Sequence, residues 1–152
     1  MRMEKEEYAE LREELSPYAT EFKVQRDRRV FVRTTPENLV SVAKLLKEKF
    51  DAYYLCTISA VDLMDSIELL YHIWSFKLRC LVSVRVKLPR DDPEIVSLCG
   101  ILPSAEILER EVKDLMGVHF RGNPKIHKRL VLPEDWPEGV YPLRKDWKGF
   151  EK

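Results

Sequence analysis

The sequence predicts an α+β fold: a single domain with a mostly antiparallel or mixed sheet flanked by helices, followed by a long extended C-terminal arm. Stretches in which apolar and polar residues alternate, the period of a strand, are interspersed with stretches whose apolar residues recur three and four apart, the period of a helix. Neither period continues after Gly117. We therefore expect a globular α+β body over residues 1–116 and an extended partner-binding arm over residues 117–152.

The N-terminal part is predicted to contain two helices separated by a β-hairpin. Residues 3–15 form a short amphipathic helix that ends before Pro17. Residues 21–34 alternate on both sides of a polar turn, which indicates the hairpin. Thr35 precedes Pro36 as the expected N-cap of the second helix. The apolar residues expected to face the core from the two helices are Tyr8, Leu11, Leu15, Leu39, Val42, Ala43, Leu45 and Leu46.

The middle of the chain is predicted to supply three strands, Tyr53–Ala60, Glu68–Trp74 and Arg79–Leu88. The third has the clearest alternation, with apolar side chains on one side and polar side chains on the other. The apolar set is Cys80, Val82, Val84, Val86 and Leu88, and the polar set is Ser83, Arg85 and Lys87.

A second helical region is predicted over Pro93–Gly100 and Ala105–Met116, with an interruption at Pro103. In the second of these helices, opposite charges lie four residues apart, where side chains meet on a helix surface. Taken alone, such pairs indicate a solvated face and contribute roughly 0.2–0.5 kcal/mol each. The pairs are Glu106–Arg110, Glu109–Lys113 and Arg110–Asp114, opposite an apolar side formed by Ile107, Leu108, Val112, Leu115 and Met116.

The charge balance gives no reason to expect a nucleic-acid partner. Lys and Arg together number 26, as do Asp and Glu, so the formal net charge is zero, whereas nucleic-acid binding depends on clustered cationic charge. The abundance of Lys, Arg and Glu and the scarcity of amide side chains are typical of proteins that work at high temperature. One short basic run, expected to be solvated because acids interrupt it, consists of Arg26, Arg28, Arg29 and Arg33.

The sequence carries no signal for membrane insertion or export. No apolar run approaches the roughly 20 residues that span a bilayer, and the charged start has no signal-peptide core. Cys56, Cys80 and Cys99 lie far apart without a C-x-x-C pattern, which indicates free thiols in a reducing compartment. We therefore expect a soluble, cytoplasmic chain that reaches the membrane only through a partner.

No convincing active site or cofactor site emerges from the residue pattern. An iron–sulfur cluster normally needs four cysteines, and the Gly-rich phosphate-binding and nucleophile motifs are absent from the sequence. His119 and His127 lack further ligands at metal-binding spacing, and Asp62 and Asp65 are expected to be exposed in a turn. The alternative interpretation is a stand-alone small cytoplasmic enzyme that uses Asp62, His72 or His119 in a cleft.

The most informative segment runs from Glu109 to Trp147. A long structureless segment is uncommon in a compact domain and is usually functional, and arginine and tryptophan are residue types that anchor protein interfaces. The segment resembles the signature of the 30-kDa subunit of respiratory complex I, the C subunit of NADH–quinone oxidoreductase, which membrane-bound complex-I-like nickel–iron hydrogenases and ferredoxin-oxidising complexes share. The matching residues are Glu109, Arg110, Glu111, Asp114, Leu115, Met116 and Gly117, then Gly122 and Pro124, and finally Pro142, Leu143, Arg144, Lys145 and Asp146.

Weaker similarity to the family reaches back through residues 60–75 and 88–105, so the resemblance covers most of the chain. Three features depart from the family pattern. Asn123 and Tyr141 stand where the family commonly has His, and residues 123–132 carry one extra residue.

The resemblance implies a non-redox structural and assembly subunit, without an active site or cofactor of its own. Its expected place is the peripheral arm of a membrane-bound oxidoreductase, at the cytoplasmic face of the cell membrane in an archaeal or thermophilic cell. There it would hold the large catalytic subunit next to the iron–sulfur subunits, whose clusters, with a nickel–iron centre in a hydrogenase, belong to those partners. The residues expected at the partner interface are Glu109, Arg110, Glu111, Asp114, Arg129, Trp136, Pro142, Leu143, Arg144, Lys145, Asp146 and Trp147.

Overall fold

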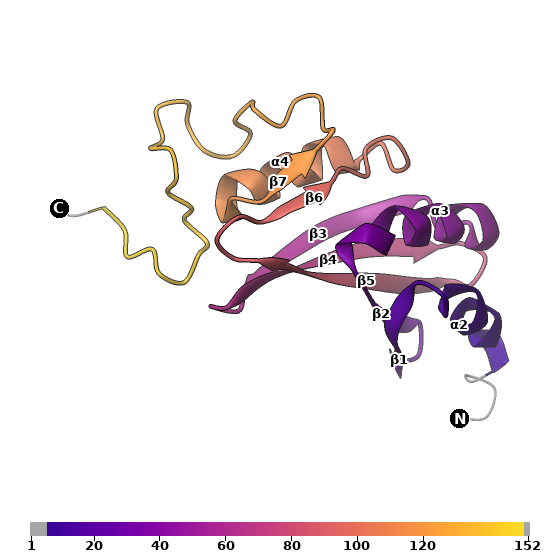
Figure 1. Ribbon diagram of the computed structural model, residues 1–152. Coiled ribbons are helices and arrows are strands. Elements are labelled where there is room, and N and C mark those ends of the chain that lie inside the picture. Colours follow the sequence, from indigo (N-terminus) through magenta and orange to yellow (C-terminus); the bar gives the residue numbers. More distant parts are fainter. Residues whose placement is uncertain (1–5, 151–152) are drawn as a thin grey trace.

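The computed structural model describes residues 6–150 and confirms the α+β class (Figure 1). The first predicted helix is present as α2, although its expected residues 3–5 lie outside the described part of the chain. The elements in chain order are α2 (Ala9–Leu15), β1 (Ala19–Arg26), β2 (Arg29–Thr34), the 3-10 turn η1 (Pro36–Asn38), α3 (Leu39–Phe50), β3 (Tyr54–Asp62), β4 (Ser66–Ser75), β5 (Cys80–Pro89), β6 (Glu94–Val96), α4 (Ala105–Met116) and β7 (His119–Arg121).

Five strands form the main sheet in the order β1-β2-β5-β4-β3. Neighbouring strands are antiparallel except β2 and β5, which run parallel, so the sheet is mixed. The predicted hairpin is β1 and β2, and the three predicted central strands are β3, β4 and β5. All five strands of the main sheet were therefore expected, and alternation is clearest in β2 and β5, whereas no residue of β1 is fully buried.

One face of the sheet packs against the helices. Along β2 and β5, burial alternates between successive residues except at Ser83, which is also buried. The buried apolar side chains join those of α2, α3 and α4 in one hydrophobic core. The predicted core residues of the first two helices are buried, except Leu45, which is only partly covered. The opposite face of the sheet is more exposed.

The prediction of a helix over Pro93–Gly100 is wrong. Residues 94–96 form β6, which pairs in parallel with β7 in a separate two-stranded sheet. Ile95 and Phe120 face each other in this pair and both are buried. Two parallel strands must be joined by a crossover connection, and α4 forms that connection between β6 and β7. The packed body thus includes a short strand after Gly117, where no strand was expected.

The start of α3 also differs from the prediction. Thr35 makes no capping hydrogen bond with its side chain. The chain instead enters the helix through η1, which contains Pro36. The fixed φ of proline suits the first turn of a helix, so the helix begins at the expected place by a different route.

Candidate partner-binding site

Helix α4 buries two acidic residues that the sequence placed on a solvated face. Its buried residues are Ala105, Glu109, Val112, Asp114 and Met116. Ile107, which was expected to face the apolar side, is instead 48% exposed. Of the three predicted ion pairs along the helix, only Glu106–Arg110 forms, at 3.3 Å. Glu109 and Asp114 therefore do not belong to a solvated face.

Glu109 is completely buried and is held by neutral donors. Its carboxylate accepts hydrogen bonds from the Ser97 hydroxyl at 2.6 Å, the Leu98 backbone N–H at 2.7 Å and Asn123 Nδ2 at 2.9 Å. Burial raises the pKa of Glu109, and these hydrogen bonds oppose that rise. Glu109 thus ties the loop after β6 to the segment after β7, with Asn123 as the link.

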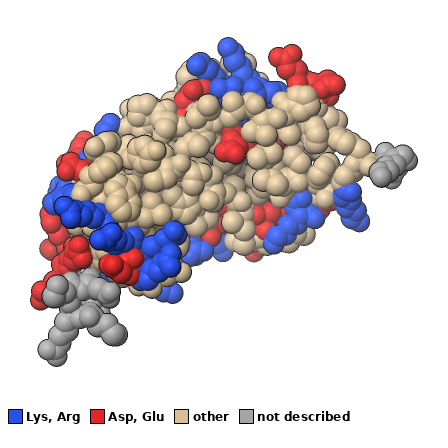
Figure 2. All heavy atoms as spheres, turned by 180° about the vertical axis from the view of Figure 1, so that it is seen from behind, with Lys and Arg blue, Asp and Glu red and all other residues tan. Residues whose placement is uncertain are grey.

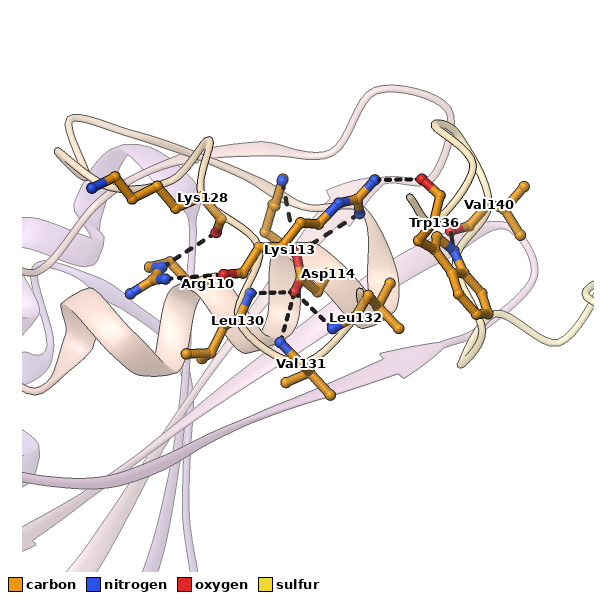
Figure 3. Close-up of polar contacts among 10 residues, drawn as sticks. Arg110, Lys113, Asp114, Lys128, Leu130, Val131, Leu132, Trp136 and Val140 are labelled. Atoms are coloured by element: carbon orange, nitrogen blue, oxygen red, sulfur yellow. Dashed lines mark hydrogen bonds and ion pairs between the residues drawn. The ribbon is translucent and has the colours of Figure 1, made fainter. Parts of the chain in front are cut away.

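Asp114 is also completely buried, and it binds the backbone of the arm. Its Oδ2 accepts hydrogen bonds from three successive backbone N–H groups, those of Leu130, Val131 and Leu132, at 2.8, 2.9 and 3.3 Å (Figure 3). Burial alone would raise the pKa of Asp114, but the three N–H groups outweigh it and hold the pKa below its ordinary value. One carboxylate therefore fixes a turn of the arm against α4.

Two arginines add contacts to the same stretch of the arm (Figure 3). Arg110 donates to the backbone carbonyls of Lys128 and Arg129, at 3.4 and 3.2 Å. The Arg129 guanidinium lies 3.9 Å from Asp114 Oδ1 and donates to the Trp136 carbonyl at 3.1 Å. Side chains of α4 and of the arm thus satisfy backbone groups that an irregular segment leaves unpaired.

The aromatic residues of the arm pack on one another. Trp136 lies 6.0 Å from Trp147 and 5.0 Å from Phe150 between ring centroids, and Trp147 lies 5.9 Å from Phe150. Trp136 also donates its indole N–H to the Val140 carbonyl at 2.9 Å. These tilted and edge-on arrangements are the ones that aromatic rings prefer. The arm therefore has a small apolar cluster of its own, which the sequence did not indicate.

Tyr141 and Arg144 attach the last part of the arm to the end of α4. Gly117 closes the helix with a φ of +76°, and a Cβ there would lie 2.4 Å from the Tyr141 ring. Arg144 Nε donates to the Met116 carbonyl at 2.8 Å, and its guanidinium lies 4.7 Å from the centre of the Tyr141 ring. The Leu143 N–H reaches the carbonyl of Leu115, at 3.1 Å. Glycine at this helix end thus permits the close approach of Tyr141.

Asp62 forms the third buried anchor, and the prediction that it would be exposed is wrong. It is 3% exposed, and Arg90 binds both of its carboxylate oxygens at 2.9 Å. The backbone N–H of Lys145 donates to Asp62 Oδ2 at 2.9 Å, and Asp146 lies 3.1 Å from Arg90. Arg90 is the main reason that the pKa of Asp62 lies well below its ordinary value. No local pattern pointed to Arg90, because it follows β5, far from Asp62 in the chain.

The predicted interface residues thus fall into two groups. Most of their polar groups bind within the chain, as described above for Glu109, Arg110, Asp114, Arg129, Arg144 and Asp146. Glu111 is half-buried, and no hydrogen bond or ion pair is found for its side chain within residues 6–150. Pro142 is half-buried and Leu143 is 59% exposed. Large apolar side chains that the arm leaves exposed are Leu130, Val131, Leu143 and Phe150.

The three residues of the alternative enzyme interpretation do not come together. Asp62 pairs with Ile67 and His72 with Thr57, which places them apart along the β3–β4 hairpin and on opposite faces of the sheet. His72 lies between two serine hydroxyls, Ser59 at 3.0 Å and Ser83 at 2.8 Å, and burial lowers its pKa. His119 is exposed on β7.

The described part of the chain offers neither a metal cluster nor a membrane-spanning helix. Residues 6–150 contain no group of three or more His, Cys, Asp or Glu side chains placed to bind a metal ion. None of the helices that the structure describes is both long and apolar enough to cross a bilayer.

Comparison with known proteins defines the class. Residues 32–152 match the family model of the respiratory-chain NADH dehydrogenase 30 Kd subunit. The match includes α4 and the arm with all three of its buried anchors. The chain belongs to this family.

Among its relatives are subunits of several complexes. The C subunit of F(420)H(2) dehydrogenase from Methanosarcina mazei is 40% identical over 111 residues, which cover 72% of this chain and 69% of that protein. The C subunit of NADH-quinone oxidoreductase from Moorella thermoacetica is 39% identical, with coverages of 74% and 75%. The beta subunit of the membrane-bound hydrogenase from Pyrococcus furiosus is 35% identical, with coverages of 80% and 71%.

Solved structures show the same fold. A chain of the membrane-bound sulfane sulfur reductase, an archaeal respiratory membrane complex, superimposes with a TM-score of 0.84 at 34% identity, covering 95% of this chain and 85% of that chain. A trypsin-resistant fragment of Nqo5 superimposes with a TM-score of 0.66 at 24% identity, covering 82% and 98%. The second likeness shows the fold alone.

Proposed function

We propose that this chain is a non-redox structural and assembly subunit in the peripheral arm of a membrane-bound, complex-I-like oxidoreductase of the hydrogenase, ferredoxin-oxidising or NADH–quinone type. It holds the large catalytic subunit next to the iron–sulfur subunits, at the cytoplasmic face of the membrane. Family membership supports this proposal, since the relatives are subunits of complex-I-like respiratory or hydrogenase complexes.

The observation that carries the proposal is the anchored arm. Three buried carboxylates, Glu109, Asp114 and Asp62, hold the segment after β7 in one path along the body. That path leaves Val131 50% exposed and Leu143 59% exposed. Large apolar side chains displayed on a fixed backbone are the kind of surface that a partner protein covers. The arm is thus prepared for docking before the partner arrives.

The cofactors of the complex belong, in this proposal, to the partner subunits. Cys56 is exposed on β3, Cys80 is buried on β5 and Cys99 is half-buried in the loop after β6. Iron–sulfur clusters are held by sets of cysteine thiolates, and these three thiols lie on separate elements. The contribution of this chain is geometric: it keeps the redox centres of its neighbours at fixed separations.

The test is purification of the affinity-tagged chain from the cells that make it, with and without detergent-solubilised membranes. We expect iron–sulfur proteins, a large hydrogenase-like subunit and membrane proteins at constant stoichiometry. The separately expressed full-length chain should contain no stoichiometric iron, acid-labile sulfide or flavin. A monodisperse chain that recovers none of these subunits, or a lone chain with its own cluster, would overturn the proposal.

A further inference from the structure

A row of large side chains crosses the exposed face of the sheet at the end opposite the arm. Strand register places Arg29 beside Leu81, Leu81 beside Trp74 and Trp74 beside Tyr54, across β2, β5, β4 and β3. Directly paired residues point to the same side of a sheet. Tyr54 is 58% exposed, and the other three are partly exposed. The row therefore forms one continuous aromatic and apolar surface with an arginine at its border.

The turn of the β1–β2 hairpin adds cationic charge to this surface. Arg26, Asp27, Arg28 and Arg29 line an open hollow of about 400 Å³ together with Trp74 and Leu81. Asp27 lies 4.0 Å from Arg28, and both side chains are largely exposed. Within residues 6–150, neither Arg26 nor Arg29 forms an ion pair. The hollow thus combines an apolar floor with excess positive charge.

Further aromatic side chains lie at the same end of the sheet, where β3 begins and β4 ends. The rings of Tyr53 and Phe76 stack with centroids 4.9 Å apart, and both side chains are about half exposed, at 53% and 47%. Figure 2 shows, from behind, Lys and Arg side chains with Asp and Glu side chains among them at the lower left, where Figure 1 places β1 and β2, beside a broad area of uncharged side chains. Exposed aromatic residues next to arginine are the composition of energetically dominant interface residues.

We propose that this surface, formed by Arg26, Arg28, Arg29, Tyr54, Trp74 and Leu81, is a second docking site. Its occupant is a segment of another subunit of the same complex that presents Asp or Glu side chains around an apolar centre. Charge complementarity selects the acids, because within residues 6–150 the ion pair made by these three arginines is that of Arg28 with Asp27. The apolar floor of the hollow is the reason for expecting apolar side chains at the centre of the partner segment. A protein is favoured over a nucleic acid because the whole chain carries no net positive charge.

This inference rests on the proposed function and adds a geometric reason for that function. The arm and the β1–β2 hairpin lie at opposite ends of the molecule (Figure 1). A subunit that holds two neighbours at a fixed separation needs two contact surfaces that do not overlap. The arm provides one surface, and the aromatic and arginine surface provides the other.

The experiment places photoreactive p-benzoylphenylalanine at position 54 of the full-length tagged chain and crosslinks the assembled complex. A second variant carries Arg26→Glu and Arg29→Glu, and Lys44→Glu, exposed on α3, serves as the matched control. We expect position 54 to crosslink to an acid-rich peptide of a different subunit. The double reversal should lower recovery of that subunit about tenfold or more, with little change for Lys44→Glu. Thermal unfolding checks that each variant folds, and Arg26→Gln with Arg29→Gln replaces the reversal if it does not.

The other outcomes overturn the inference. They are a crosslink to a second copy of this chain, to nucleic acid or to lipid, a crosslink to a segment without acidic residues, and no crosslink at all. If the complex is recovered through the tag but the crosslink fails, the second site is wrong while the proposed function stands. If the tag recovers no subunit of a membrane complex from the unaltered chain, the proposed function itself has failed.

Discussion

Asp114 on α4 accepts a hydrogen bond from the backbone N–H of Leu130 at 2.8 Å, although 16 residues separate them in the chain. The same oxygen accepts the next two N–H groups of the arm. The three N–H donors stabilise the charge of this buried carboxylate, and Lys113 and Arg129 lie 3.8 and 3.9 Å from its other oxygen. Thus the helix that carries the family motif also determines the path of the arm.

Replacing Asp114 with alanine should destabilise the arm. The N–H groups of residues 130–132 would lose their acceptor in a partly buried setting, at a cost of about 1–3 kcal/mol. Urea unfolding measures this loss, and hydrogen exchange should show faster exchange at those three amides. Glu111→Ala on the same helix is the control and should change stability by less than about 0.5 kcal/mol. Equal protection of the three amides in both variants would contradict the anchoring role.

Gly117→Ala should destabilise the chain more than Gly139→Ala. Both glycines have positive φ, +76° and +75°, so both substitutions carry similar backbone strain. Only at Gly117 would the new Cβ collide with another side chain, the Tyr141 ring. We expect roughly 1 kcal/mol of strain at Gly139 and an additional loss at Gly117, compared by thermal unfolding. Adding Tyr141→Ala to Gly117→Ala should relieve the collision, and an unchanged difference would refute this explanation.

Because of Asp62, the free energy of unfolding should decrease as the pH becomes acidic. Arg90 is the main cause of the depressed pKa of Asp62 in the folded state. The contribution of Asp62 to the free energy of unfolding is therefore complete above the unfolded pKa of about 3.9. It is lost as pH falls through that value toward the folded pKa. Asp62→Asn should therefore lower stability at pH 7 and reduce the acid slope by at most about 1.4 kcal/mol per pH unit. Urea unfolding between neutral pH and about pH 2 measures it. Asp65→Asn, exposed in the turn after Asp62, is the control and should change stability at pH 7 by less than about 0.5 kcal/mol.

Arg144→Ala and Glu111→Ala should reduce assembly more than turnover. Arg144 holds Tyr141 and the Met116 carbonyl, so its loss would displace the exposed Leu143. Leaving the Met116 carbonyl without its donor typically costs about 1–3 kcal/mol, which loosens the part of the arm that we propose to dock. The measurements are the yield of purified complex and the activity per assembled complex. Full yield with abolished activity would show that these residues take part in the reaction, contrary to a scaffold role.

The main sheet could be predicted because its clearest strands, such as β5, reveal their buried face locally. Val82, Val84 and Val86 alternate with polar residues, and the structure places them in the core of β5. Residues 94–96 could not be predicted in this way, because three residues are too few for a period. Their strand exists only through pairing with β7, a contact between distant parts of the chain.

The signature from Glu109 to Asp146 pointed to the correct family, and the assignment of these residues to a partner interface stays a prediction. The signature did not show that the polar residues bind the arm to its own body. It also missed Arg90 and Tyr141, which complete two of the attachments.

By itself, the sequence determined α2, α3, α4 and the five strands of the main sheet, since burial of one face imposes a period on neighbouring residues. It also determined the family, because the motif residues between Glu109 and Asp146 follow one another along the chain in the order of the family signature. The direction in which Glu109, Asp114 and Asp62 point was decided only by the tertiary structure. A spacing of four residues places charges on a helix surface, but it does not say which surface another segment will cover. Here the arm covers it, and a buried carboxylate is stable there because donors from remote parts of the chain converge on it.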